Sequence, residues 1–194
     1  MKIFTSLGVA ALLLLVLTGC GQPPWLAAVA PATVAPTTVA RAAVINDLAA
    51  GSVVRPLAAG DAALSVTYWS TLTMDQWTAA AEKPLSLSLQ ATLGTDTGQL
   101  VYLSKLSVAY VVIGPTGPMN ETLAPFADVA AVVPGYLVKA PYSYSQNLVI
   151  PAVDATATSV QITATYEMLV QAAPGSSDYA KQTASDTITV AIAR

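Results

Sequence analysis

Hydrophobic and polar residues alternate along much of the chain after about residue 43. The clearest example is 85–93, "LSLSLQATL", where Leu or Ala occupies every second position and Ser, Gln or Thr lies between them. Segments 64–72, 160–168 and 188–192 follow the same period. A period of two places the apolar side chains on one face of a strand and the polar ones on the other. This is typical of antiparallel sheets with one buried face, so the sequence predicts an all-β domain.

Turn-forming residues separate these segments. "GTDTG" at 94–98 predicts a hairpin between the strand before it and the long apolar segment 99–114. Within that second strand the apolar phase shifts around Ser104 and Lys105, which predicts a β-bulge. "PGSSDYAKQ" at 174–182 predicts the turn between the last two strands.

One segment departs from the strand pattern. Thr73 and Gln76 have the spacing of a capping box, alanines follow, and Pro84 ends the segment, so we expect one short helix near 74–82. Residues 43–194 as a whole predict a single antiparallel β-sandwich of about seven to nine strands. By pattern it resembles immunoglobulin and fibronectin domains, although the Cys and Trp hallmarks of true immunoglobulin domains are absent.

The first 19 residues have the three zones of a secretion signal. Lys2 supplies the positive start, residues 7–17 form an apolar core, and Thr18 and Gly19 are small. The apolar core is shorter than the ~20 residues that a transmembrane helix needs. We therefore expect 1–19 to be a signal peptide that is cleaved off.

The segment Leu17-Thr18-Gly19-Cys20 resembles the lipobox of bacterial lipoproteins. The resemblance implies that Cys20 receives a diacylglycerol on its sulfur, becomes the first residue after cleavage, and is acylated on its amino group. Two or more chains anchor a protein stably to a bilayer. The alternative is an ordinary signal followed by an incidental cysteine. Cys20 is the only cysteine, so the chain cannot form an internal disulfide.

The same resemblance indicates a cell-envelope location. Gly21, and not Asp, follows Cys20, which by analogy with enteric lipoproteins favours the outer membrane in a cell with two membranes. In a cell with one membrane, the protein would lie on the outer face of the plasma membrane. The expected membrane contact is the lipid anchor, and no cofactor beyond this covalent lipid is expected.

Residues 20–42 predict a tether between the lipid and the domain. The segment is rich in Pro, Ala, Thr and Val, and its prolines favour extended backbone over a long helix. Trp25 is the exception in this composition. Its indole is a candidate contact with the membrane interface, with the protein's own domain or with a partner.

Composition excludes several classes of function. The formal net charge is −3 and no basic segment occurs, so nucleic acid is not an expected partner. The chain has no histidine, which removes Ser-His-Asp triads and His-based metal sites. The carboxylates are scattered, and we expect those of Asp96, Asp128 and Asp154 to be solvated in loops. A serine–lysine dyad using Lys105, Lys139 or Lys181 stays open.

Aromatic residues are the remaining candidates for ligand or partner contacts. Trp69 falls in the polar phase of its strand, so we expect it on the outer face, where it would meet solvent or a partner. Tyr142 and Tyr144 lie two residues apart and would project from the same face of an extended segment. An outward pair could bind a sugar ring, a peptide or a protein. The alternative is that the rings pack into the core or over its rim.

Three functional hypotheses follow. The first is a lipid-anchored, non-catalytic β-sandwich that makes structural or protein–protein contacts in an envelope complex. The second is a lipoprotein that binds a glycan or a hydrophobic small molecule. The third is a hydrolase that works without histidine, for which the sequence offers the least support.

Overall fold

The computed structural model describes residues 44–194, in which the alternating segments form strands of two antiparallel sheets. The signal peptide, Cys20, the tether and Trp25 lie outside the described residues. Within these residues, no helix is long and apolar enough to span a membrane.

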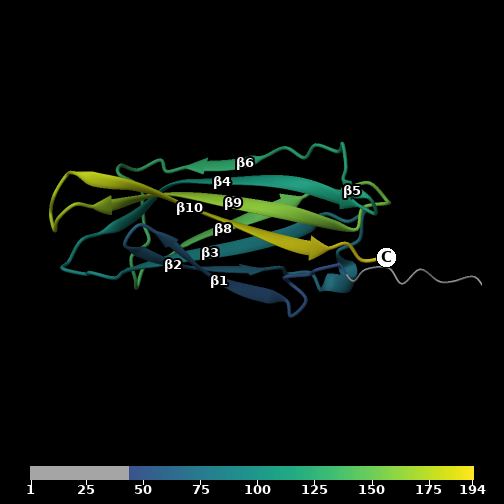
Figure 1. The fold of residues 1–194 in the computed structure, drawn as a ribbon, viewed down its shortest axis with the longest axis horizontal. Coiled ribbons are helices and arrows are strands. Elements are labelled where there is room, and N and C mark those ends of the chain that lie inside the picture. The colour runs from purple at the N-terminus through teal and green to yellow at the C-terminus, as the bar shows by residue number, and fades with distance from the viewer. Residues whose placement is uncertain (1–43) are drawn as a thin grey trace, which may run out of the picture. The chain divides into compact units, whose positions relative to one another are not determined.

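The first sheet has four strands in the order β1-β2-β3-β8. Their bounds are β1 Ser52–Ala59, β2 Ala62–Trp69, β3 Lys83–Leu93 and β8 Tyr144–Ile150. The second sheet is built on β10 Tyr179–Ala191, β9 Ser159–Gln171 and β4 Val101–Gly114, in that order. Three short strands pair with the far side of β4: β5 Gly117–Pro118, β6 Phe126–Val129 and β7 Tyr136–Leu137. Figure 1 shows the two layers.

The core lies between the two sheets and contains the apolar phase of each alternating segment. In β3 the buried side chains are those of Leu85, Leu87, Leu89 and Ala91, and in β9 they are those of Val160, Ile162, Ala164, Tyr166 and Met168. Burial of this apolar surface is the main stabilising contribution in a domain without a disulfide. The predicted all-β sandwich is therefore confirmed, with ten strands in the described residues and not seven to nine.

The two sheets of the sandwich are joined by several crossing connections. β2-β3-β8 face β10-β9-β4, and the chain crosses between the sheets after β3, after β7 and after β8. β1 is an additional edge strand. The predicted hairpin at 94–98 is wrong, because β3 and β4 belong to different sheets. The predicted turn between β9 and β10 and the bulge between Leu103 and Lys105 are both confirmed.

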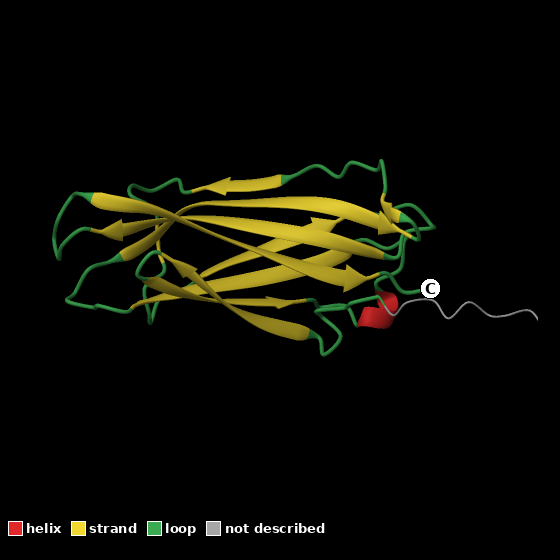
Figure 2. Ribbon diagram, in the orientation of Figure 1, coloured by secondary structure: helices red, strands yellow, loops and turns green. Residues whose placement is uncertain are grey.

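The predicted helix near 74–82 is wrong. The segment contains one 3-10 turn, Met74–Gln76, and Thr73 makes no side-chain capping bond. It is the red element in Figure 2. The reason is tertiary: the side chain of Trp77 is fully buried, and its Nε1 donates to Ser70 Oγ at 2.9 Å. Burial of the indole determines the backbone conformation at residue 77. This tertiary contribution outweighs the helix propensity of the alanines that follow.

A buried lysine holds the loops at the same end of the sandwich. The side chain of Lys83 is fully buried, and its Nζ donates to the carbonyl oxygens of Ala81 at 2.7 Å, Pro151 at 3.0 Å and Ala79 at 3.4 Å. Burial lowers the pKa of this amine, and nearby Glu121 partly offsets that effect. The three bonds use all the donors of the ammonium group, so Lys83 is a structural clamp between two loops.

Candidate interaction surfaces

The outer face of the four-stranded sheet carries no charged side chain at any outward strand position. We call this surface the uncharged face. Its residues are Ser52, Val54, Pro56 and Ala58 from β1, Ala63, Ser65, Thr67 and Trp69 from β2, Pro84, Ser86, Ser88, Gln90 and Thr92 from β3, and Ser145, Asn147 and Val149 from β8. Charged side chains are enriched on ordinary protein surfaces, so a whole sheet face without them is unusual.

Trp69 is the largest side chain of the uncharged face. It lies in register with Ser52 on one side and Ser86 on the other, and its neighbours leave it half-buried. Two valines lie at the same end of this face, Val54 at 59% and Val149 at 61% exposed. Trp69 therefore lies on the outer face, as predicted. Its neighbours cover part of the ring, so the side chain is only partly exposed. Val54 lies on β1, the strand next to that of Trp69, and Val149 lies two strands away on β8.

Tyr142 and Tyr144 do not form the predicted outward pair. Tyr142 is 59% exposed but lies in the turn before β8, whereas Tyr144 begins the strand and is only 9% exposed. The alternation argument requires extended backbone through both residues, and the strand does not include Tyr142. Tyr144 instead stacks on Tyr136, with ring centroids 5.3 Å apart. Its ring packs at the rim of the core, which is the alternative left open by the sequence.

Asp128 was predicted to be a solvated loop carboxylate, and that prediction is wrong. It lies in β6 opposite the buried Leu106 and faces inward. Tyr144 Oη donates to its Oδ2 at 2.5 Å and Tyr136 Oη to its Oδ1 at 3.3 Å. Burial raises the pKa of Tyr144, and the hydrogen bond to Asp128 raises it further. These three side chains close the side of the sandwich between β8 and β6, and only the pairing of β6 could have revealed this.

The opposite side of the sandwich, between β1 and β10, is closed by a second polar cluster. Tyr68 and Tyr166 are fully buried and their hydroxyl oxygens are 2.9 Å apart. Arg55 lies nearer the edge, with its Nη2 2.7 Å from Asp47 Oδ1 and its Nε 3.9 Å from Asp186 Oδ2. Burial raises the pKa of Tyr68, and interaction with Tyr166 and then with Asp186 adds to the effect.

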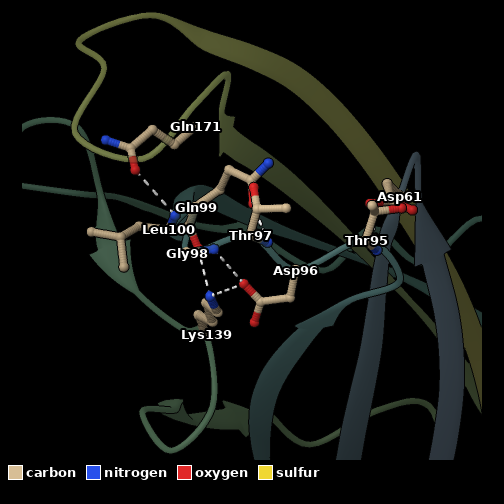
Figure 3. A network of polar contacts seen from close by, with 9 residues as sticks. All are labelled: Asp61, Thr95, Asp96, Thr97, Gly98, Gln99, Leu100, Lys139 and Gln171. Carbon is tan, nitrogen blue, oxygen red and sulfur yellow. Dashed lines mark hydrogen bonds and ion pairs between the residues drawn. The ribbon is translucent and has the colours of Figure 1, made fainter.

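A third polar network lies in the loops that join β3 to β4 and β7 to β8 (Figure 3). Lys139 Nζ is 2.6 Å from Asp96 Oδ1 and 2.7 Å from the Gln99 carbonyl oxygen, and the Gly98 amide donates to Asp96 at 2.9 Å. The hydrogen bond from Lys139 lowers the pKa of Asp96. Asp96 is exposed in a loop, as predicted, and so is Asp154. These bonds hold the two loops together.

The remaining chemical candidates in residues 44–194 are potential metal ligands and the three lysines named from the sequence. No group of three His, Cys, Asp or Glu side chains within 44–194 is placed to hold a metal ion. The lysines considered for a serine–lysine dyad are ion-paired: Lys139 to Asp96, and Lys105 and Lys181 both to Glu167. Their ion-pair partners are carboxylates, and not the serine hydroxyl that such a dyad requires. Neither a protein-family model nor a curated protein matches the chain.

Proposed function

We propose that the protein is a lipid-anchored, non-catalytic module of the cell envelope that binds a partner protein through the uncharged face. The membrane anchor in this proposal is Cys20, on the resemblance of residues 17–20 to a lipobox. The observation that carries the contact is the absence of charge from the outer face of an entire sheet. A partner that covers this face displaces water from Ser, Thr, Ala and Val side chains without having to desolvate any charged side chain.

Trp69 is the expected centre of the contact. Trp is among the residues that contribute most to binding free energy when a partner covers it. Its half-buried ring is held by flanking strands, so little side-chain entropy remains to be lost on binding. Val54 and Val149 extend the apolar area on either side of it.

The arrangement gives less support to a glycan platform at Tyr142 and Tyr144. Only Tyr142 is accessible there, and sugar binding by stacking needs an exposed ring face. Hydrolysis without histidine has no support from any group of described side chains. A structural or protein-binding role therefore stands first.

A photo-crosslinking experiment in native envelopes tests the proposal. The photoreactive amino acid p-benzoylphenylalanine replaces Thr67 on the uncharged face or, as a matched control, Thr187 on the outer face of the other sheet. We expect one discrete crosslinked species from position 67, none from position 187, and loss of the species when Trp69→Ser is added. Equal crosslinking from both positions, or a species unaffected by Trp69→Ser, would refute binding through this face.

The anchor is tested separately by mass spectrometry of the mature protein. We expect a chain that begins at Cys20 and carries a diacylglycerol and an additional acyl group. Cys20→Ala should release the protein from membranes into the soluble fraction. A mature chain with an unmodified thiol would refute the anchor and leave the argument for the uncharged face intact.

A further inference from the structure

The outer face of the six-stranded sheet contains a shallow apolar hollow of about 300 Å³. Its lining comes from three neighbouring strands and the residue before β6: Ser107, Val108 and Ala109 from β4, Thr163 and Thr165 from β9, and Pro125, Phe126 and Ala127. None of these side chains is charged. The volume lies at the lower end of the range of small-molecule sites.

The hollow lies where the pairing of β6 with β4 ends. β6 pairs with β4 only from Lys105 to Val108, and the next paired strand, β5, begins opposite Ile113. Over the interval between them, no strand is paired with this edge of β4. Small side chains at Ala109 and Ala127, both on the outer face, leave space that larger residues would fill. The space is therefore part of the sheet's construction.

Charged groups lie at one end of this hollow. Lys105 is two residues before Ser107 on the same face of β4, which places it about 7 Å further along the strand. Lys105 and Lys181 both pair with Glu167, so the cluster has one net positive charge. These three are the only charged residues at outward strand positions in either sheet of the described part of the chain.

The other end is apolar. Val111 is two residues beyond Ala109 on the same face and is 41% exposed. From Lys105 to Val111 the face is about 20 Å long, since each strand residue advances the chain ~3.3 Å. The surface thus changes along one line from positive charge, through an apolar hollow, to an exposed valine.

We propose that this hollow binds single-chain anionic amphiphiles, with the hydrocarbon chain over Ala109 and Ala127 and the acid group beside Lys105. The mainly apolar lining favours contact with a hydrocarbon chain over contact with water. The single net positive charge matches one carboxylate or phosphate. The uncharged face on the opposite sheet stays free, so this binding is independent of the proposed partner contact.

Sodium decanoate, below the concentration at which it forms micelles, is the probe. It is titrated into the ¹⁵N-labelled chain from residue 20 onward, with Cys20→Ser so that the protein has no lipid of its own, and binding is followed by amide chemical shifts. We expect saturable shifts confined to 105–111, 125–129 and 163–167. Decanol should bind more weakly, and methyl β-glucoside should cause no saturable shift.

Three variants assign the two parts of the site. Ala109→Phe fills the hollow and should weaken decanoate binding by about tenfold or more, which corresponds to the loss of a few buried methylene groups. Ala127→Leu provides the same test at a second position if Ala109→Phe does not fold. Lys105→Met should weaken decanoate binding about two- to fivefold, as expected for an exposed charge pair, and leave decanol binding unchanged.

Ala63→Phe on the uncharged face is the matched control and should leave binding unchanged. The proposal is overturned if decyltrimethylammonium binds as tightly as decanoate, because the positive cluster would then have no role. It is also overturned if the shifts are spread over the domain, if filling the hollow has no effect, or if methyl β-glucoside shifts the same amides. None of these outcomes bears on the anchor or the uncharged face.

Discussion

Alkaline pH should unfold the domain because three tyrosine hydroxyl groups are buried. Tyr68 and Tyr166 are 1% and 0% exposed, and Tyr144 is 9% exposed. Burial raises the pKa of all three in the folded state above the ordinary value of 10.0. The folded protein therefore keeps protons that the unfolded chain releases, and the stability present below pH 10 is lost as the pH rises further.

The size of the effect follows from the unfolded pKa. At pH 11 the unfolded chain gains roughly 1.4 kcal/mol for each tyrosine that ionises there but stays neutral in the folded protein. Three such tyrosines lower the free energy of unfolding by about 4 kcal/mol, a large share of the 5–15 kcal/mol typical of a domain. Tyr68 and Tyr166 account for about 2.8 kcal/mol of this.

Urea denaturation at pH 7, 9, 10 and 11 measures this loss, and the double variant Tyr68→Phe/Tyr166→Phe isolates the buried pair. Removing both hydroxyls together leaves neither without its partner, so at pH 7 the variant should differ from the parent by about 1 kcal/mol or less. Between pH 7 and pH 11, the free energy of unfolding of the variant should rise by roughly 2–3 kcal/mol relative to that of the parent. Tyr142→Phe, at an exposed position, is the control for loss of a hydroxyl.

The contribution of Lys83 to the free energy of unfolding changes with pH in the opposite direction. For this reason the parent must be compared with the double variant at each pH. Burial lowers the pKa of Lys83 from 10.5, so the unfolded chain binds a proton more readily than the folded one. Its contribution to stability therefore increases as the pH rises toward 10.5 and is constant above that. Because Lys83 is present in both proteins, its effect cancels. A pH profile that is parallel for parent and double variant up to pH 11 would contradict the reasoning.

Three further changes test the packing. Trp77→Ala removes a fully buried indole and should lower the free energy of unfolding by about 3–5 kcal/mol, measured by urea denaturation. Gly135→Ala should destabilise by about 1–3 kcal/mol or shift the loop, seen as displaced amide resonances, because an added Cβ would lie 2.5 Å from the Leu103 carbonyl oxygen. Lys139→Met should change the free energy of unfolding by less than about 1 kcal/mol, since its partner Asp96 is exposed; a larger loss would show that the loop network contributes to folding.

The two open sides of the sandwich are closed by different polar chemistry. Arg55, Asp47 and Asp186 lie between β1 and β10, whereas Asp128 and two tyrosines lie between β8 and β6. Apart from the buried Lys83 and the cluster of Lys105, Glu167 and Lys181, the other charged side chains of the described residues lie outside the strands, so the outer faces of both sheets carry little charge. This distribution is what makes the uncharged face and the apolar hollow stand out.

The sequence by itself determined which side chains are buried along the strands whose residues alternate clearly. Leu85, Leu87 and Leu89 alternate with polar residues, and a strand can bury only one of its two faces, so their position in a core followed from the period alone. The phase shift at Ser104 located the bulge for the same reason. The absence of histidine and the single cysteine limited the chemistry of the whole chain.

Only the tertiary structure decided which strands are neighbours. Residues 94–98 form a turn in either topology, but pairing between distant strands placed β3 and β4 in different sheets. The same long-range pairing turned Asp128 inward, stacked Tyr144 on Tyr136 and buried Trp77 where a local helix was expected. The physical reason is that local periodicity specifies the faces of a strand, whereas its partners are selected by the core that all strands bury together.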